Sequence, residues 1–152
     1  MSTLLNLLLI FLSMVGLADS GYITYEEWAN VPSICQNIPG FDCGAVLDSA
    51  WAHIGPVPLS VLGFGFYATV FLLATYHLVM VQPKQSLTNV LLLLATSGFL
   101  FSLFLVYLQA VVIGAYCLFC MISAITSTLI FFTTVGFWWS RRQEQKNTEK
   151  SE

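Results

Sequence analysis

The chain has 152 residues, of which 57% are hydrophobic and only 9% charged, and its mean hydropathy is +0.80. A soluble domain carries about 25% charged residues, so the composition excludes an ordinary soluble domain, a disordered chain and a nucleic-acid-binding protein. Residues 85–140 contain no Asp, Glu, Lys or Arg. The composition therefore predicts a small membrane protein with several spans.

Four apolar runs are candidate membrane spans. A helix needs about 20 apolar residues to cross the hydrocarbon core, and residues 57–82, 87–113 and 115–139 meet this length. The run 3–18 is shorter, and we favour a retained first span over a cleaved signal peptide because no Lys or Arg precedes it. We predict an all-α, polytopic four-helix bundle over residues 1–140.

The basic residues predict the orientation of the bundle. They follow the second or the fourth span and therefore lie on one side: Lys84, Arg141, Arg142, Lys146 and Lys150. The positive-inside rule makes that side cytoplasmic. The loop 19–56, with five acidic residues and no Lys or Arg, is then external, and residues 141–152 form a charged cytoplasmic tail.

Two cysteine pairs lie on the external side. Cys35 and Cys43 belong to the loop, and Cys117 and Cys120 form a C-x-x-C at the start of the last span. A helix N-terminus stabilises a thiolate, which favours a reactive pair. Two structural disulfides are the alternative, although a bridge over so short a loop adds little constraint. The spacing disfavours a zinc site, so we expect no metal.

The loop is expected to contain a short helix on the membrane surface. Asp42 is a good N-cap for a helix that begins at Cys43, and Gly55-Pro56 is a strong stop. One apolar face of this helix would contain Val46, Leu47, Ala50 and Trp51. The helix would hold Cys43 over Cys117, whereas Cys35, beyond the Pro39-Gly40 turn, is expected to face water.

The two pairs suggest a relay in which electrons pass inward by thiol–disulfide exchange. The outer pair would meet a soluble protein, and the inner pair lies at the edge of the lipid. A thiolate at that edge can reduce only a molecule that dissolves in the bilayer. The natural two-electron acceptor there is a quinone.

The sequence resembles the vitamin K epoxide reductase family, in particular its bacterial members, which act as quinone-linked disulfide-bond oxidases. The resemblance covers residues 3–139. It is carried, in order along the chain, by Cys35, the segment 43–51 (CGAVLDSAW), Pro58-Leu59-Ser60 with Gly63, and the segment 117–120 (CLFC).

The resemblance implies a role for each of these residues. Cys120 would contact and reduce ubiquinone or menaquinone, Cys117 would exchange with Cys43, and Cys35 would take electrons from a periplasmic thioredoxin-like (DsbA-like) protein. Ser49 and Trp51 would pack the loop helix over the active site, and Ser60 would lie at the mouth of the quinone pocket. The expected location is the bacterial inner membrane.

Two positions depart from the animal members of the family. Those members have an Asn and a Tyr where this chain has Leu59 and Ala124, which favours simple quinone reduction over vitamin K epoxide reduction. Some bacterial members carry a fused thioredoxin-like domain, and the short tail here leads us to expect a separate partner. Epoxide or quinone reduction as the main activity, and a non-enzymatic scaffold with structural disulfides, remain alternatives.

Three further polar residues lie near the expected depth of the site. Gln109 and Tyr107, in the outer third of the third span, are candidates to donate hydrogen bonds to a quinone carbonyl, and interhelical packing explains them equally well. His53, in the loop helix, is a candidate to shuttle protons, but a surface role is favoured.

Overall fold

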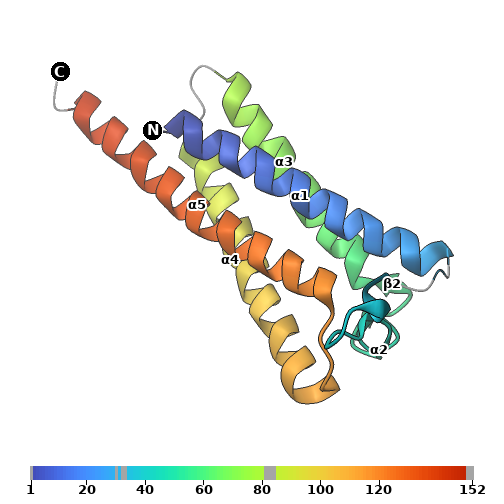
Figure 1. Cartoon of the computed structure of the whole chain (residues 1–152). Coiled ribbons are helices and arrows are strands. Elements are labelled where there is room, and N and C mark those ends of the chain that lie inside the picture. Colours follow the sequence, from blue (N-terminus) through green and yellow to red (C-terminus); the bar gives the residue numbers. More distant parts are fainter. Residues whose placement is uncertain (1, 30, 32–33, 81–84, 150–152) are drawn as a thin grey trace.

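The computed structural model describes residues 2–29, 31, 34–80 and 85–149. Four long helices form most of it (Figure 1), and each is long and apolar enough to cross a membrane. They are α1 (Ser2–Ala29), α3 (Leu59–Val79), α4 (Gln85–Tyr107), which continues into the π-helical turn η2 (Leu108–Ile113), and α5 (Leu118–Glu149). The predicted all-α four-helix bundle is confirmed.

Helix α1 packs against both α3 and α5, and α4 packs against α5. The core between them consists of apolar side chains from all four helices: Leu9, Leu12, Tyr67, Val70, Ala74, Leu91, Ala95 and Ile130. Gly16 allows α1 and α3 to approach closely, because a Cβ atom at this position would overlap the Tyr67 ring. Small residues at such crossings are typical of membrane helix pairs.

The first helix is longer than the sequence suggested. It runs beyond Ala18 to Ala29, so the first part of the expected external loop 19–56 is helical. The reason is packing at its C-terminal end, where Ile23 is buried and the Tyr22 ring lies 5.0 Å from the Phe119 ring. As a result α1 extends to the end of the bundle that carries the cysteines.

The loop between α1 and α3 contains the short helices η1 (Ile34–Asn37) and α2 (Cys43–Leu47) and a small antiparallel hairpin of β1 (His53–Ile54) and β2 (Val57–Pro58). Helix α2 begins where predicted, and the Asp42 Oδ1 accepts a hydrogen bond from the Ala45 N–H at 3.0 Å. These short elements lie together at one end of the bundle (Figure 1).

Helix α2 ends at Leu47, so the expected helical face that included Ala50 and Trp51 is wrong. The hairpin accounts for the early end: it turns at Gly55, whose φ is +63°. The Leu59 N–H at the start of α3 donates to the Ala52 carbonyl at 2.9 Å. Ala52 is thereby joined to the start of α3, and its own N–H donates to the Ser49 carbonyl at 3.0 Å in a turn that replaces the expected helix.

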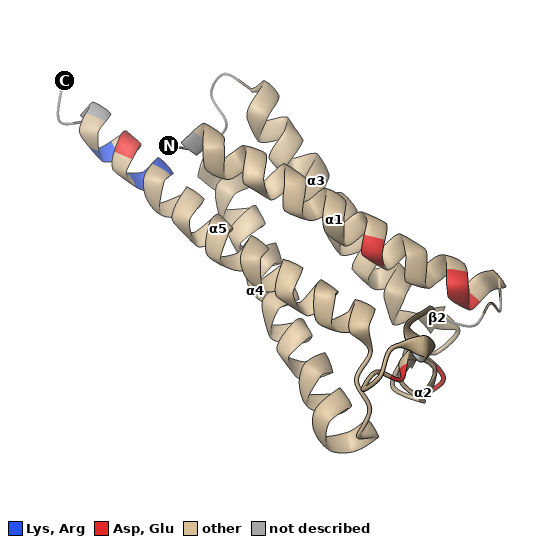
Figure 2. Ribbon diagram, viewed as in Figure 1, with Lys and Arg blue, Asp and Glu red and all other residues tan. Residues whose placement is uncertain are grey.

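Charge is distributed unequally along the bundle (Figure 2). All described Lys and Arg residues lie in the last part of α5, at the opposite end from α2. The predicted membrane orientation also depends on Lys84 and Lys150, which lie outside the described residues. An external loop and a cytoplasmic tail fit this distribution and remain a prediction.

Candidate active site

Three cysteine sulfurs lie close together where α2 meets the start of α5. Cys35 and Cys43 form a disulfide with a Cα–Cα distance of 5.9 Å, while Cys117 and Cys120 are free thiols. The Sγ atoms of Cys35, Cys43 and Cys117 all lie within 4.8 Å of one another, and all three residues have 0% exposed surface. The fold thus brings a free thiol into the immediate neighbourhood of a disulfide.

A backbone contact sets the register between the two cysteine segments. The Asp42 N–H donates to the Tyr116 carbonyl at 2.9 Å, so the residue before Cys43 is joined to the residue before Cys117. Around this contact, apolar side chains close the cluster against water: Phe41, Val46, Leu47, Ile113 and Leu118. The juxtaposition of Cys43 and Cys117 therefore does not depend on the sulfur atoms alone.

Cys117 occupies the N-cap position of α5. Its Sγ accepts a hydrogen bond from the Cys120 N–H at 3.4 Å, as the side chain of an N-cap residue does. A hydrogen bond from the Cys120 thiol, and further ones from the backbone N–H groups of Cys120 and Phe119, lower the pKa of the Cys117 thiol although burial opposes this. Because the thiolate is the nucleophile in exchange, Cys117 is primed to react.

Gln109, in the π-helical turn η2, is hydrogen-bonded to the backbone of Cys117. Its Oε1 accepts the Cys117 N–H at 2.9 Å, and its backbone carbonyl accepts the Gly114 N–H, also at 2.9 Å. Gly114 adopts a φ of +72°, a conformation that glycine takes at little cost, and it turns the chain from η2 back toward α5. Gln109 therefore couples this turn to the start of α5.

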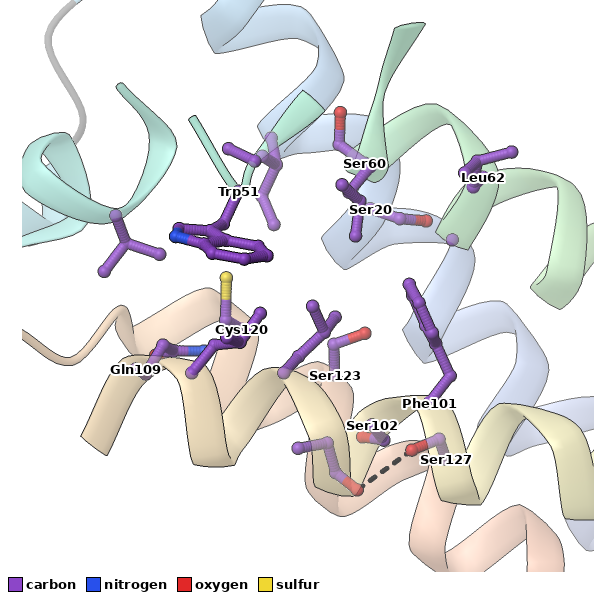
Figure 3. Close-up of a pocket in the computed structure, with 18 of the residues that line it drawn as sticks. Ser20, Trp51, Ser60, Leu62, Phe101, Ser102, Gln109, Cys120, Ser123 and Ser127 are labelled. Carbon is purple, nitrogen blue, oxygen red and sulfur yellow. Dashed lines mark hydrogen bonds between the residues drawn. The ribbon is translucent and has the colours of Figure 1, made fainter. Parts of the chain in front are cut away.

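A cavity of about 440 Å³ lies between the helices next to Cys120 (Figure 3). Its wall is mostly apolar and includes Phe66, Phe101 and Leu105. The Cys120 thiol stands in this wall beside the Trp51 ring (Figure 3). Cys117 thus has the loop disulfide on one side and, through Cys120, the cavity on the other.

Four of the residues named as candidates for quinone contact line this cavity: Ser49, Trp51, Ser60 and Gln109. Tyr107 does not, and 57% of its surface is exposed. Gln109 shares one helical face with Leu105 and Leu108, which also line the cavity, whereas Tyr107, two residues before Gln109, points to the opposite side of the helix. Because Gln109 Oε1 already accepts the Cys117 N–H, only its amide nitrogen is available to a ligand.

The predicted exposure of Cys35 is wrong. The sequence suggested that it faces water, but it is completely buried beside Cys117. The turn at residues 38–41 folds η1 back onto α2, with the Phe41 N–H donating to the Ile38 carbonyl at 3.1 Å. In this arrangement neither cysteine of the loop disulfide is exposed to solvent.

The sequence reasoning missed the contribution of α1 to the cavity. Ser20, Ile23 and Glu27 all line it, and their spacing of three and four residues places them on one helical face. That spacing was the signal available in the sequence. Two further lining residues were also missed, Tyr67 on α3 and Ser123 on α5. They are joined by a hydrogen bond from the Tyr67 hydroxyl to the Ser123 carbonyl at 2.9 Å.

These features define a membrane-spanning helix bundle with two facing cysteine pairs at one end and an apolar cavity beside the inner pair. The sequence profile of the vitamin K epoxide reductase family matches residues 7–135, and the chain belongs to this family. It is also similar to the thiol-disulfide oxidoreductase LTO1 of Arabidopsis thaliana, with 30% identity over 125 residues. That match covers 77% of this chain but 32% of LTO1, so the chain spans about a third of the length of this relative.

Proposed function

We propose that this protein is a membrane thiol:quinone oxidoreductase that oxidises a thioredoxin-like partner and passes the electrons to a membrane quinone. The observation that carries the proposal is the position of Cys117. Its sulfur lies within 4.8 Å of both sulfurs of the loop disulfide, and the next cysteine along α5 stands in the wall of an apolar cavity. Thiol–disulfide exchange requires such an approach of a thiolate to a disulfide.

The relay has two exchange steps between the cysteine pairs. A dithiol partner first reduces the Cys35–Cys43 disulfide and is itself oxidised. The Cys43 thiolate then attacks Cys117 in a Cys117–Cys120 disulfide and releases the Cys120 thiolate. Cys35 resolves the mixed disulfide by attacking Cys43, which leaves two thiols at Cys117 and Cys120. The structure has this last arrangement, with a loop disulfide and two free inner thiols.

The cavity supports a quinone as the electron acceptor. Its volume of about 440 Å³ falls within the range of small-molecule sites, and its mostly apolar wall suits an aromatic ring that arrives from the bilayer. Gln109 lines the cavity, and because its Oε1 accepts the Cys117 N–H, its amide nitrogen would be the donor to a quinone carbonyl oxygen. Leu59 and Ala124, which replace the Asn and Tyr of animal members, also line the cavity and favour quinone over epoxide reduction.

The partner must open the loop before it can react. Both loop cysteines are fully buried in the closed arrangement, so η1 has to move away from Cys117 for a partner thiolate to reach a sulfur atom. The same motion would separate the outer pair from the inner pair. Loop opening thus keeps reduction by the partner distinct from transfer to Cys117.

The test is anaerobic mixing of the detergent-solubilised protein with a reduced thioredoxin-like protein and a soluble quinone, with quinone loss followed by absorbance. We expect the wild type to consume quinone and Cys120→Ala and Cys43→Ala to lose this activity. Met121→Ala is the control, because Met121 neighbours Cys120 on α5 but does not line the cavity. Quinone loss that persists in both cysteine variants would contradict the proposal, and its absence in the wild type would favour structural disulfides.

A further inference from the structure

One wall of the cavity carries a carboxyl group with two polar neighbours. Glu27, near the outer end of α1, lines the cavity, and its Oε2 accepts a hydrogen bond from the Ser60 hydroxyl. Its Oε1 lies 3.9 Å from the His53 Nε2. The His53 side chain is 42% exposed and that of Glu27 only 11%, so the three residues connect water with the cavity.

We propose that Glu27 delivers a proton to the quinone in this cavity and is reprotonated from external water through His53. The inference deepens the proposed function and rests on it. Ser60 acts as a positioning residue, because its hydroxyl lies in the cavity wall and holds the Glu27 carboxyl group beside the bound ring.

Proton balance shows why such a group is needed. Reduction of a quinone to a quinol takes two electrons and two protons. Both electrons come from Cys117 and Cys120 as their S–S bond forms. If Cys117 enters as a thiolate, only the Cys120 thiol brings a proton. The second proton comes from the Glu27 carboxyl group, which becomes a carboxylate and regains its proton through His53.

The surroundings of Glu27 favour proton transfer over a purely structural role. An acidic side chain in an apolar membrane cavity is costly, and such residues commonly mark proton or ligand pathways. The titratable groups near Glu27 on neighbouring elements are His53 on β1, which lies beside it, Cys120 on α5, on which the Glu27 charge acts, and Tyr67 on α3, which lines the same cavity. The adjacent Glu26 faces elsewhere, with its Oε1 3.4 Å from the Ile34 N–H.

The test compares wild type, Glu27→Gln, Glu27→Asp and His53→Gln, each reduced beforehand and mixed with a soluble quinone over a range of pH. General acid catalysis contributes about 100-fold or more, so we expect Glu27→Gln to slow quinone reduction by at least about 10-fold and to remove one ionisation from the pH profile. Glu27→Asp, which keeps an acidic proton, should restore part of the rate. His53→Gln should slow the reaction most at high pH, where protons are scarce.

A second readout separates this role from folding. Reduction of the Cys35–Cys43 disulfide by a dithiol, measured by alkylation without quinone, should be unchanged in all variants. Asp48→Asn is the matched control, since Asp48 is an exposed carboxylate outside the cavity wall. An unchanged rate and pH profile in Glu27→Gln, or equal losses of exchange and quinone reduction, would overturn the inference and leave the proposed function standing. A wild type that exchanges thiols but reduces no quinone would overturn both.

Discussion

Cys117 is the residue on which both halves of the site depend. Its sulfur lies beside the loop disulfide and accepts two hydrogen bonds from Cys120, one from the thiol and one from the backbone N–H. Its own backbone N–H donates to Gln109. Each of these neighbours affects a different property: the reaction partner, the stability of the thiolate and the position of the helix end. These contributions are separable by substitution.

The lowered pKa of Cys117 has a consequence for its pH dependence. A lowered pKa means that the thiolate persists to lower pH and is lost only as pH falls through the lowered value. We expect a titration of thiolate absorbance in a Cys35→Ser/Cys43→Ser variant to show this early ionisation. Adding Cys120→Ala removes the hydrogen bond from the Cys120 thiol and should move the midpoint to higher pH. An unchanged midpoint would show that Cys120 does not stabilise the thiolate.

Gln109 is expected to contribute to stability through the Cys117 N–H. Gln109→Leu leaves this buried donor without its acceptor, which costs about 1–3 kcal/mol. We expect the free energy of unfolding in detergent to fall by that amount and the exchange between Cys117 and the loop disulfide to slow. Gln143→Leu, at an exposed position of α5, should change neither. A Gln109→Leu protein as stable as the wild type would mean that another group satisfies the N–H.

At the level of whole helices, the α1–α3 contact holds one wall of the cavity in place. Gly16→Ala forces a Cβ atom into the Tyr67 ring, whose hydroxyl is bonded to Ser123 on α5. Overpacking of this kind costs about 1–3 kcal/mol, and we expect a lower melting temperature in detergent and slower quinone reduction. Gly65→Ala on α3 is the control, because no atom of another helix lies within 4 Å of its added Cβ. Equal stability of the two variants would contradict the close packing of α1 on α3.

The helices that the sequence predicted correctly are those fixed by local properties. Apolar runs long enough for the bilayer gave the spans, and the N-cap Asp42 gave the start of α2. The ends of α1 and α2 were not predictable in this way. The apolar run of the first span stops at Ala18, but packing against α3 and α5 continues the helix to Ala29. The hairpin that shortens α2 likewise depends on its contact with the start of α3.

The site was predicted only as far as topology allowed. The spans place all four cysteines at the same end of the bundle, and the structure brings three of their sulfurs together. The burial of Cys35 and the acceptor role of Gln109 arise from tertiary contacts between segments far apart in the chain. The outward position of Tyr107 was open to prediction, because residues two apart on a helix point to nearly opposite sides and Tyr107 and Gln109 cannot both face the cavity.

For the molecule as a whole, the charge distribution predicts one orientation in the membrane. We expect a membrane-impermeant thiol reagent to label Ala50→Cys from outside intact spheroplasts and Gln143→Cys only in inverted vesicles, both in a background without the native cysteines. Both positions are exposed, and they lie in the loop and in the basic end of α5. The reverse labelling pattern would place the redox site on the cytoplasmic side and would exclude a periplasmic partner.

The most direct test of the relay is to trap its mixed disulfide. In a Cys35→Ser/Cys120→Ser variant only Cys43 and Cys117 remain, and mild oxidation followed by alkylation and mass measurement reports whether they join. We expect rapid and nearly complete formation of a Cys43–Cys117 bond, and much slower bonding in Cys35→Ser/Cys117→Ser, which retains Cys43 and Cys120. If Cys43 and Cys117 both remain open to alkylation, or if Cys43 joins Cys120 faster, electrons do not pass from the loop to the membrane through Cys117.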